Sequence, residues 1–321
     1  MRILKLLVLL LAATAVTLAS GQGYPNRPVK LMVPYAPGGL PDTIARLIGA
    51  KMGDSLGQQV VIENKGGAGG ITGVTDVVKA PADGYTLLIA DVGQVAINPH
   101  LFSKLPYDPI KDLAPVSLVG TSALYLVAHP SVGVNNMNEL VALARAQPGK
   151  LNYGSSGIGS IHHLATEALR SGLGIDIVHV PYKGTGQSVP ALLGGQVALL
   201  YAALPSILGH MKEGKVKVLA VSTSQRSPQT PEVPTVAESG VPGYEFVAEI
   251  GLLAPAGTPR EIVERLAAEV AKAVKQADVA QRFTQLGIDA VGSTPEAYGA
   301  KNRVAYEKFA QIVKATGVKI D

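Results

Sequence analysis

The stretch VKLMVPYAPGGLPDTIARLIGAKMGDSLG, Val29 to Gly57, contains an apolar run, a turn rich in proline and glycine, and a helix-like segment in direct succession. Val29, Leu31 and Val33 alternate as in a strand, and residues 43–56 carry apolar side chains at helical spacing. Proline fixes the backbone, whereas glycine permits a positive φ or the close approach of another group. The stretch therefore predicts a strand, a turn whose shape matters, and a helix.

The same succession is repeated along the rest of the chain. Apolar, strand-like runs lie at 58–65, 84–92, 117–130, 151–156, 176–182, 196–204 and 215–223, and longer helix-like segments separate most of them. This alternation is typical of βαβ units around a mostly parallel sheet. The 321 residues suffice for two domains of ordinary size, and the second half of the series reads as a second α/β lobe.

The N-terminus has the layout of a secretory signal peptide. Arg2 and Lys5 precede the apolar stretch from Leu6 to Ala19, and small residues follow it. The stretch is shorter than the roughly 20 residues that cross a bilayer, which disfavours the alternative of a retained membrane helix. We therefore expect residues 1–21 to be a signal peptide and the mature protein to be exported to the periplasm.

The composition and motifs argue against several function classes. The chain has 28 Lys and Arg against 24 Asp and Glu, a net charge of +4, which does not indicate nucleic-acid binding. It has no cysteine, which excludes disulfides and thiolate metal ligands. Zinc-protease, mononucleotide, dinucleotide and nucleophile-elbow motifs do not occur. We therefore expect no cofactor, no metal and no catalytic residue.

Four loops, at 36–39, 66–70, 154–160 and 182–186, place glycine or a turn between a strand and a helix. The carboxyl ends of strands bind ligands in open α/β sheets, and the free amides of helix N-termini favour anions. The loops thus predict an anion-accepting cleft, although glycine pairs are also ordinary turn residues. In the third loop Ser160 is a candidate helix cap, and His163 is a candidate for packing or for the site.

Ordered segments of the chain resemble one family closely. Among them are VPYAPGGLPDTIAR, VVIENKGGAGGITG, AINPHLFSKLPYDPIKDLAPV, LNYGSSGIGSIHHL, HVPYKGTG and RSPQTPEVPTVAESGVPGYE. These segments are similar to those of the Bug-type (TctC-like) solute receptors, the substrate-binding proteins of tripartite tricarboxylate transporters. The resemblance implies an α/β fold of the two-lobed, type II periplasmic binding protein class, which closes over its ligand like a Venus flytrap. It implies lobe I at 22–122 and 247–321, with lobe II at 123–246 and the ligand cleft between them.

The resemblance also implies a ligand and a set of contacts. The ligand would be a small organic carboxylate: a di- or tricarboxylic acid, an aromatic acid or an acidic amino acid. The wall from lobe I would consist of Tyr35, Pro37, Gly38, Gly39, Asp42 and Gly93. The wall from lobe II would consist of Ser155, Gly157, Ser160, Tyr182 and Gly184, with His163 beside it.

Three positions leave the identity of the ligand undecided. Asp42 either stabilises the first turn of its helix or reaches a bridging water or a ligand ammonium. Ala202 stands where the family commonly has an aspartate, which argues against an amino acid as the ligand. Glu249 replaces part of an aromatic pair, and it offers an acceptor to the ligand if it faces the cleft but none if it faces solvent.

The expected function is a non-catalytic periplasmic receptor that captures a carboxylate and delivers it to a membrane permease. We expect a monomer that binds no nucleic acid. The alternatives are a sensory protein that presents its liganded surface to a membrane kinase, and an enzyme that acts on a carboxylate in the same cleft.

Overall fold

The computed structural model describes residues 23–318, so the expected signal peptide lies outside the described residues. Its strands are β1 (Val29–Val33), β2 (Val60–Asn64), β3 (Thr86–Ala90), β4 (Leu113–Ala128), β5 (Asn152–Ser155), β6 (Val178–Pro181), β7 (Leu199–Ala203), β8 (Lys217–Val221), β9 (Val247–Pro255) and β10 (Ile288–Ala290). Its α-helices are α2 (Leu40–Leu56), α3 (Ile71–Val78), α4 (Asn98–Leu101), α5 (Met137–Ala146), α6 (Ile161–Leu173), α7 (Thr185–Leu193), α8 (Leu204–Lys212), α9 (Arg260–Lys275), α10 (Ala277–Gln285) and α11 (Pro295–Thr316). Short helical turns are η1 (Ala68–Gly70), η2 (Gly93–Ile97) and η3 (Pro130–Val132). No helix between residues 23 and 318 has the length and apolar character of a membrane span.

The strands form two groups that are joined by one long strand. In the first half-sheet, β1 pairs in parallel with β2 and β3, and β9 pairs antiparallel with β3. In the second half-sheet, β5 pairs in parallel with β6 and β7. Strand β4 belongs to both halves, because it pairs with β9 and β10 along its first part and with β7 and β8 along its last part.

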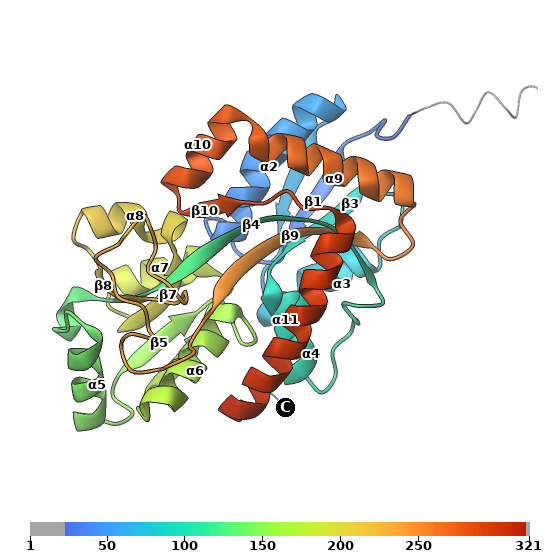
Figure 1. Cartoon of the computed structure of the whole chain (residues 1–321). Helices are drawn as coiled ribbons and strands as arrows, with labels where there is room; N and C mark the ends of the chain where they lie inside the picture. Colours follow the sequence, from blue (N-terminus) through green and yellow to red (C-terminus); the bar gives the residue numbers. More distant parts are fainter. Residues whose placement is uncertain (1–22, 319–321) are drawn as a thin grey trace, which may run out of the picture.

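The change of partner along β4 occurs at one point. Residues from Leu113 to Ala123 pair with β9, and residues from Leu124 to Ala128 pair with β7. Figure 1 shows β4 and β9 crossing between the group of α5 to α8 and the group of α2, α3, α9 and α11. The crossing strands thus connect two α/β halves of the molecule, which explains its two-lobed shape.

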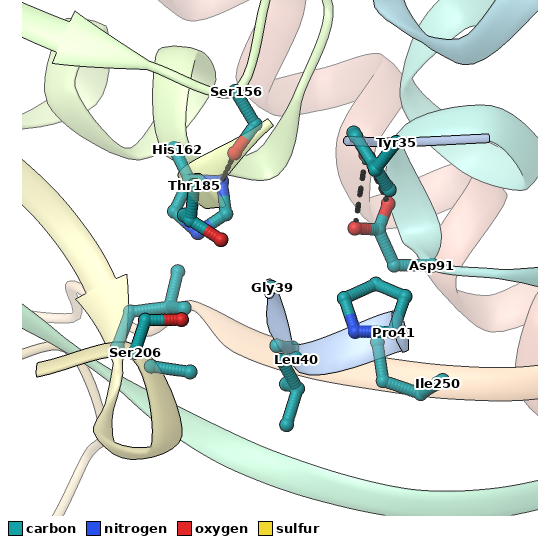
Figure 2. Close-up of a pocket in the computed structure, with 13 residues that line it drawn as sticks. Tyr35, Gly39, Leu40, Pro41, Asp91, Ser156, His162, Thr185, Ser206 and Ile250 are labelled. Atoms are coloured by element: carbon teal, nitrogen blue, oxygen red, sulfur yellow. Dashed lines mark hydrogen bonds between the residues drawn. The ribbon is translucent and has the colours of Figure 1, made fainter. Parts of the chain in front are cut away.

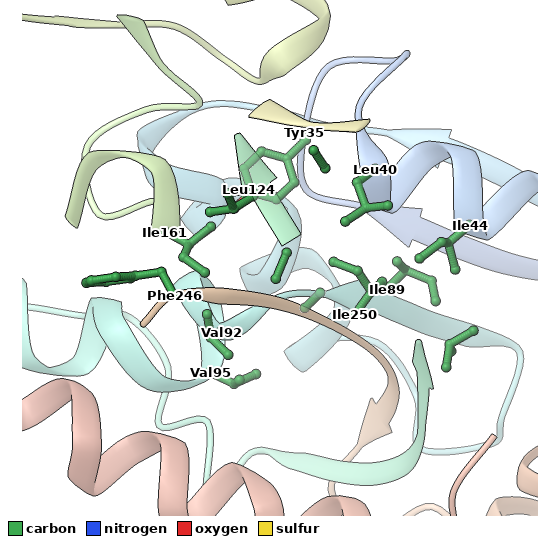
Figure 3. Close-up of a cluster of buried hydrophobic side chains, with 14 of the residues drawn as sticks. Tyr35, Leu40, Ile44, Ile89, Val92, Val95, Leu124, Ile161, Phe246 and Ile250 are labelled. Atoms are coloured by element: carbon green, nitrogen blue, oxygen red, sulfur yellow. The ribbon is translucent and has the colours of Figure 1, made fainter. Parts of the chain in front are cut away.

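Buried aliphatic side chains hold these halves together. Ile44 of α2 and Ile89 of β3 are fully buried in one large core cluster. That cluster also includes Leu124 and Ile161, which come from the far end of β4 and from α6 (Figure 3). Full burial of one such side chain stabilises a fold by about 1.5–3 kcal/mol. The apolar positions that the strand and helix periods marked are therefore the positions that pack.

The sheet differs from the expected one in its strand directions. Among the named strands of residues 23–318, parallel pairs join only β1, β2 and β3 and only β5, β6 and β7, whereas every pair that β4 makes is antiparallel. The expectation of a mostly parallel sheet is wrong for the centre of the molecule. The chain returns there through β9 and β10, which come from distant parts of the sequence, and local periodicity carries no information about such pairing.

Candidate functional site

Loops from both half-sheets surround one pocket that lies between them. Four of its residues follow the carboxyl end of a strand: Tyr35 after β1, Asp91 after β3, Ser156 after β5 and Thr185 after β6. The other lining residues are Gly39, Leu40, Pro41, Leu124, His162, Ala203, Ser206, Ala248 and Ile250. In Figure 2, Ser156, His162, Thr185 and Ser206 face Tyr35, Asp91, Pro41 and Ile250 across the pocket. The predicted cleft at the strand ends is thus present between the lobes.

Three helices begin at this pocket without a side-chain cap. Helix α2 starts after Gly39, α7 starts after Gly184, and α8 starts after Ala203, and none of these three residues caps its helix with a side chain. By contrast, Ser160 caps α6 and accepts a hydrogen bond from the amide of His163. The first amides of a helix have no partner within the helix and carry partial positive charge. The pocket therefore offers amide donors to an anion, with no lysine or arginine among its lining residues.

The two sides of the pocket touch each other at its rim. The amide of Ala36 donates a hydrogen bond of 2.8 Å to the carbonyl oxygen of Lys183. The hydroxyl of Ser206 donates to the carbonyl oxygen of Gly38 at 3.4 Å. These contacts join the loop after β1 to the segments after β6 and β7, so the structure has the lobes closed on the pocket.

Asp42 stabilises its own loop instead of lining the pocket. Its carboxylate accepts hydrogen bonds from the amide of Gly38 at 2.9 Å, from Asn64 at 2.9 Å and from Arg46 at 3.1 Å. Burial alone would raise the pKa of Asp42, but the bonds from Arg46, Gly38 and Asn64 outweigh it and lower this pKa. Of the two expected roles for Asp42, the geometry favours the one within the first turn of the helix.

Asp91 is a buried carboxylate in the wall of the pocket. It accepts a 2.7 Å bond from the amide of Gly93 and bonds of 3.0 and 3.1 Å from the hydroxyl of Tyr35. The hydroxyl oxygen of Tyr35 in turn accepts a 2.8 Å bond from the side-chain amide of Gln94. Burial raises the pKa of Asp91 to about 6, and the bonds from Gly93 and Tyr35 oppose that rise. Tyr35 therefore contributes a hydroxyl to a polar network, and Gly93 contributes its amide.

The histidine in the pocket is His162, the neighbour of the expected His163. The Nδ1 atom of His162 lies 2.8 Å from the hydroxyl of Ser156, and burial lowers the pKa of this imidazole to about 4. His163 instead stacks on His179 at a ring distance of 4.2 Å. Successive residues of a helix point about 100° apart, so only one of two adjacent histidines faces a given pocket. His163 thus has the packing role that the sequence left open.

The remaining predicted residues lie around the pocket rather than in its lining. Ser155 bonds the amide of Gly157 and lies 2.6 Å from His179. The carbonyl oxygen of Ser155 accepts a bond from the amide of Tyr182. Of the fourteen predicted positions only Tyr35 and Gly39 line the pocket, while the others outside it are Pro37, Gly38, Asp42, Gly93, Ser155, Gly157, Ser160, His163, Tyr182, Gly184, Ala202 and Glu249.

Ala202 and Glu249 point away from the pocket because of strand alternation. Ala203 lines the pocket, and its neighbour Ala202 is fully buried in the core of the second half-sheet. On β9, Ala248 and Ile250 line the pocket, while Glu249 faces a groove on the other side and forms a 3.0 Å ion pair with Lys301. Neither position lines the pocket in this closed structure.

Several lining residues escaped the sequence reasoning. Ser156 and Thr185 lie in the expected loops at 154–160 and 182–186 but were not among the expected contacts. Asp91 lies at the end of the marked run at 84–92 and Ser206 just after the run at 196–204, so their place at the end of a strand was a usable signal. No signal in the sequence pointed to Leu124, because its place depends on how β4 crosses between the lobes. Among residues 23–318, no group of three or more His, Asp or Glu side chains could hold a metal ion.

Comparisons with known proteins agree with this geometry. The chain matches the family described as the tripartite tricarboxylate transporter family receptor over residues 44–318. It is 37% identical to Protein BugT of Bordetella pertussis over 304 residues, which are 94% of this chain and 93% of BugT.

Two solved structures from Rhodopseudomonas palustris are also similar. Rpa4515 with adipate is 35% identical, with a TM-score of 0.89 over 92% of this chain and 98% of that one. MatC with bound malate is 36% identical, with a TM-score of 0.87 over 90% of this chain and all of that one. The predicted family and the predicted binding-protein fold are confirmed, as is the prediction of a receptor rather than an enzyme, because these relatives are substrate-binding proteins. The chain is a solute-binding protein that belongs to the tripartite tricarboxylate transporter receptor family.

Proposed function

We propose that this receptor binds a small organic carboxylate in the pocket between its lobes and delivers it to the permease of a tripartite tricarboxylate transporter. One observation carries the proposal: three helices without side-chain caps, α2, α7 and α8, begin at the same pocket. The adipate and malate that two relatives hold in their structures support a carboxylate as the ligand.

The lining of the pocket fits a short carboxylic acid. Amides at helix N-termini bind a carboxylate, and each charge-assisted hydrogen bond contributes on the order of 1.5–3 kcal/mol. Leu40, Leu124 and Ile250 offer an apolar surface to the carbon chain between the acid groups. A few such bonds together with closure are compatible with a micromolar Kd, which corresponds to about −8 kcal/mol.

The proposed lobes are residues 22–122 with 247–321, and residues 123–246. The change of partner along β4 between Ala123 and Leu124 and the start of β9 at Val247 support these boundaries. Opening would then bend the chain at the two crossing strands and break the contact between Ala36 and Lys183. A ligand that touches both lobes favours the closed state by its differential affinity for it.

The place of action would be the periplasm, and the receptor would work there as a monomer. The arrangement of Arg2, Lys5 and the apolar stretch after them supports export. The family to which the chain belongs supports a permease as the partner. Deletion of the gene separates transport from sensing: loss of carboxylate uptake supports the proposal, whereas loss of induction with intact uptake contradicts it.

Mass spectrometry of small molecules released from the gently purified protein tests the ligand class directly. We expect a carboxylic acid, and the same acid should raise the melting temperature of the emptied protein. In Gly39→Val the new Cβ would lie only 2.6 Å from the Thr185 hydroxyl, and the side chain would extend into the pocket, so this thermal shift should disappear. Gly209→Val is the control, because no atom lies within 4 Å of a Cβ there. A retained shift in Gly39→Val contradicts the assignment of the pocket.

A further inference from the structure

Asp91 is an anion in a pocket that is proposed to bind anions. Its exposed fraction is 3%, and among the described residues no cationic side chain forms an ion pair with it. Transfer of an unpaired carboxylate out of water is costly, and a second carboxylate nearby adds repulsion. A ligand with carboxylates alone would therefore be opposed by Asp91.

The hydrogen bonds around Asp91 leave it as an acceptor. The Tyr35 oxygen accepts from the Gln94 amide, so the single Tyr35 proton is donated to Asp91. Oδ1 also accepts from the amide of Gly93, whereas Oδ2 has only the Tyr35 hydroxyl as a hydrogen-bond donor. A carboxylate oxygen can accept two bonds, so Oδ2 has capacity for another donor from the pocket.

The surroundings of Asp91 supply no other compensating charge. The titratable side chains that face it are Tyr35 from the loop after β1, Tyr107 from the segment before β4 and Tyr298 from α11. Burial raises the pKa of each of these phenols, so all three are neutral. His162 lies in the same pocket, and burial lowers its pKa to about 4, which keeps it neutral as well.

We propose that Asp91 determines specificity by favouring carboxylate ligands that also carry a hydrogen-bond donor, a hydroxyl or an ammonium group, which it accepts at Oδ2. The inference rests on the proposed function, because it takes the same pocket to hold the carboxylate at the helix N-termini. A plain dicarboxylate brings no donor, so its binding requires Asp91 to take up a proton. The pKa of Asp91 near 6 makes that uptake possible and makes the affinity for such a ligand fall as the pH rises.

Titration calorimetry with matched ligands tests the inference. Malate and aspartate each differ from succinate by one substituent, a hydroxyl and an ammonium group. At pH 8 the wild type should bind at least one of the two substituted acids tenfold or more tightly than succinate. In Asp91→Asn this ratio should shrink at least tenfold, because asparagine still accepts from Gly93 and Tyr35 but has no charge. Asp54→Asn is the control with the same chemical change at an exposed position of α2, and it should preserve the ratio.

The wild type alone provides a second readout that needs no variant. Titrations with succinate in buffers of different ionisation enthalpy should give an uptake of up to one proton at pH 8, whereas the favoured substituted acid should give almost none. An unchanged ligand ratio in Asp91→Asn, or succinate binding without proton uptake, overturns the role of Asp91 and leaves the receptor function intact. Failure of the wild type to bind any carboxylate overturns both.

Discussion

Gly186 and Pro37 lie on opposite lobes with almost no space between them. A Cβ on Gly186 would overlap the carbonyl oxygen of Pro37. Nearby, a Cβ on Gly66 would lie 2.7 Å from the carbonyl oxygen of Lys183, and one on Gly184 would lie 2.9 Å from the amide of Ala36. Glycine is the residue type that permits such close backbone approach, so these positions allow the lobes to close.

Gly186→Ala should prevent full closure without harming either lobe. Gly186 is the second residue of α7, where alanine favours the helix by about 1 kcal/mol over glycine. The added methyl group meets the other lobe only when the lobes close. We expect ligand affinity to fall at least tenfold, and the radius of gyration in X-ray scattering to stay that of the ligand-free protein after ligand addition. Gly209→Ala in α8, where no atom is within 4 Å, should behave as wild type.

Asp42→Ala should destabilise the protein at neutral pH. The substitution removes an acceptor for Gly38, Asn64 and Arg46, and we expect a loss of about 1–3 kcal/mol in the free energy of unfolding. Because the folded state lowers the pKa of Asp42, its contribution is present above the unfolded pKa of about 4 and is lost as the pH falls through the folded value. Urea denaturation should show a smaller difference in the free energy of unfolding between the wild type and Asp42→Ala at pH 3 than at pH 7. Equal differences at both pH values would contradict this assignment.

Buried His162 should make the protein less stable in mild acid. Its folded pKa of about 4 lies below the unfolded value of about 6.5, so the unfolded state binds the proton first as the pH falls. This histidine alone should reduce the free energy of unfolding by about 2 kcal/mol between pH 8 and pH 5. Denaturant titrations between pH 8 and pH 5 measure how the free energy of unfolding falls with pH. In His162→Gln this fall should be smaller by the contribution of the histidine. If the free energy of unfolding fell equally with pH in the variant and the wild type, groups other than His162 would cause the acid sensitivity.

Glu249→Gln should leave the binding profile unchanged. The side chain lies on the face of β9 opposite the pocket, where it pairs with Lys301. The adjacent Ala248 lines the pocket and is 3% exposed, so Ala248→Leu should fill the space and weaken binding at least tenfold. Calorimetry with the ligand identified by mass spectrometry compares the two variants. A changed ligand preference in Glu249→Gln would show that this carboxylate reaches the ligand after all.

The local features of the fold could be predicted because they depend on neighbours in sequence. The alternation in Val29–Val33 and the apolar run before Ser156 marked strands, and the glycines after Tyr35 and before Thr185 marked the turns that follow strands. The predicted ends of helices were less exact than the predicted strands and turns. The helix expected at 43–56 begins earlier, at Leu40, because Pro41 is accommodated in the first turn, where a helix needs no amide donor.

The sequence by itself determined the family, the βαβ succession and the glycine loops of the cleft, since periodicity and turn chemistry are properties of adjacent residues. Only the tertiary structure decided which side chains meet the pocket. Asp91 and Ser156 are distant in the chain but face each other across the pocket, because β4 and β9 cross between the lobes. Strand alternation separates Ala248 from Glu249, but the face that meets the ligand is fixed by pairing between distant strands.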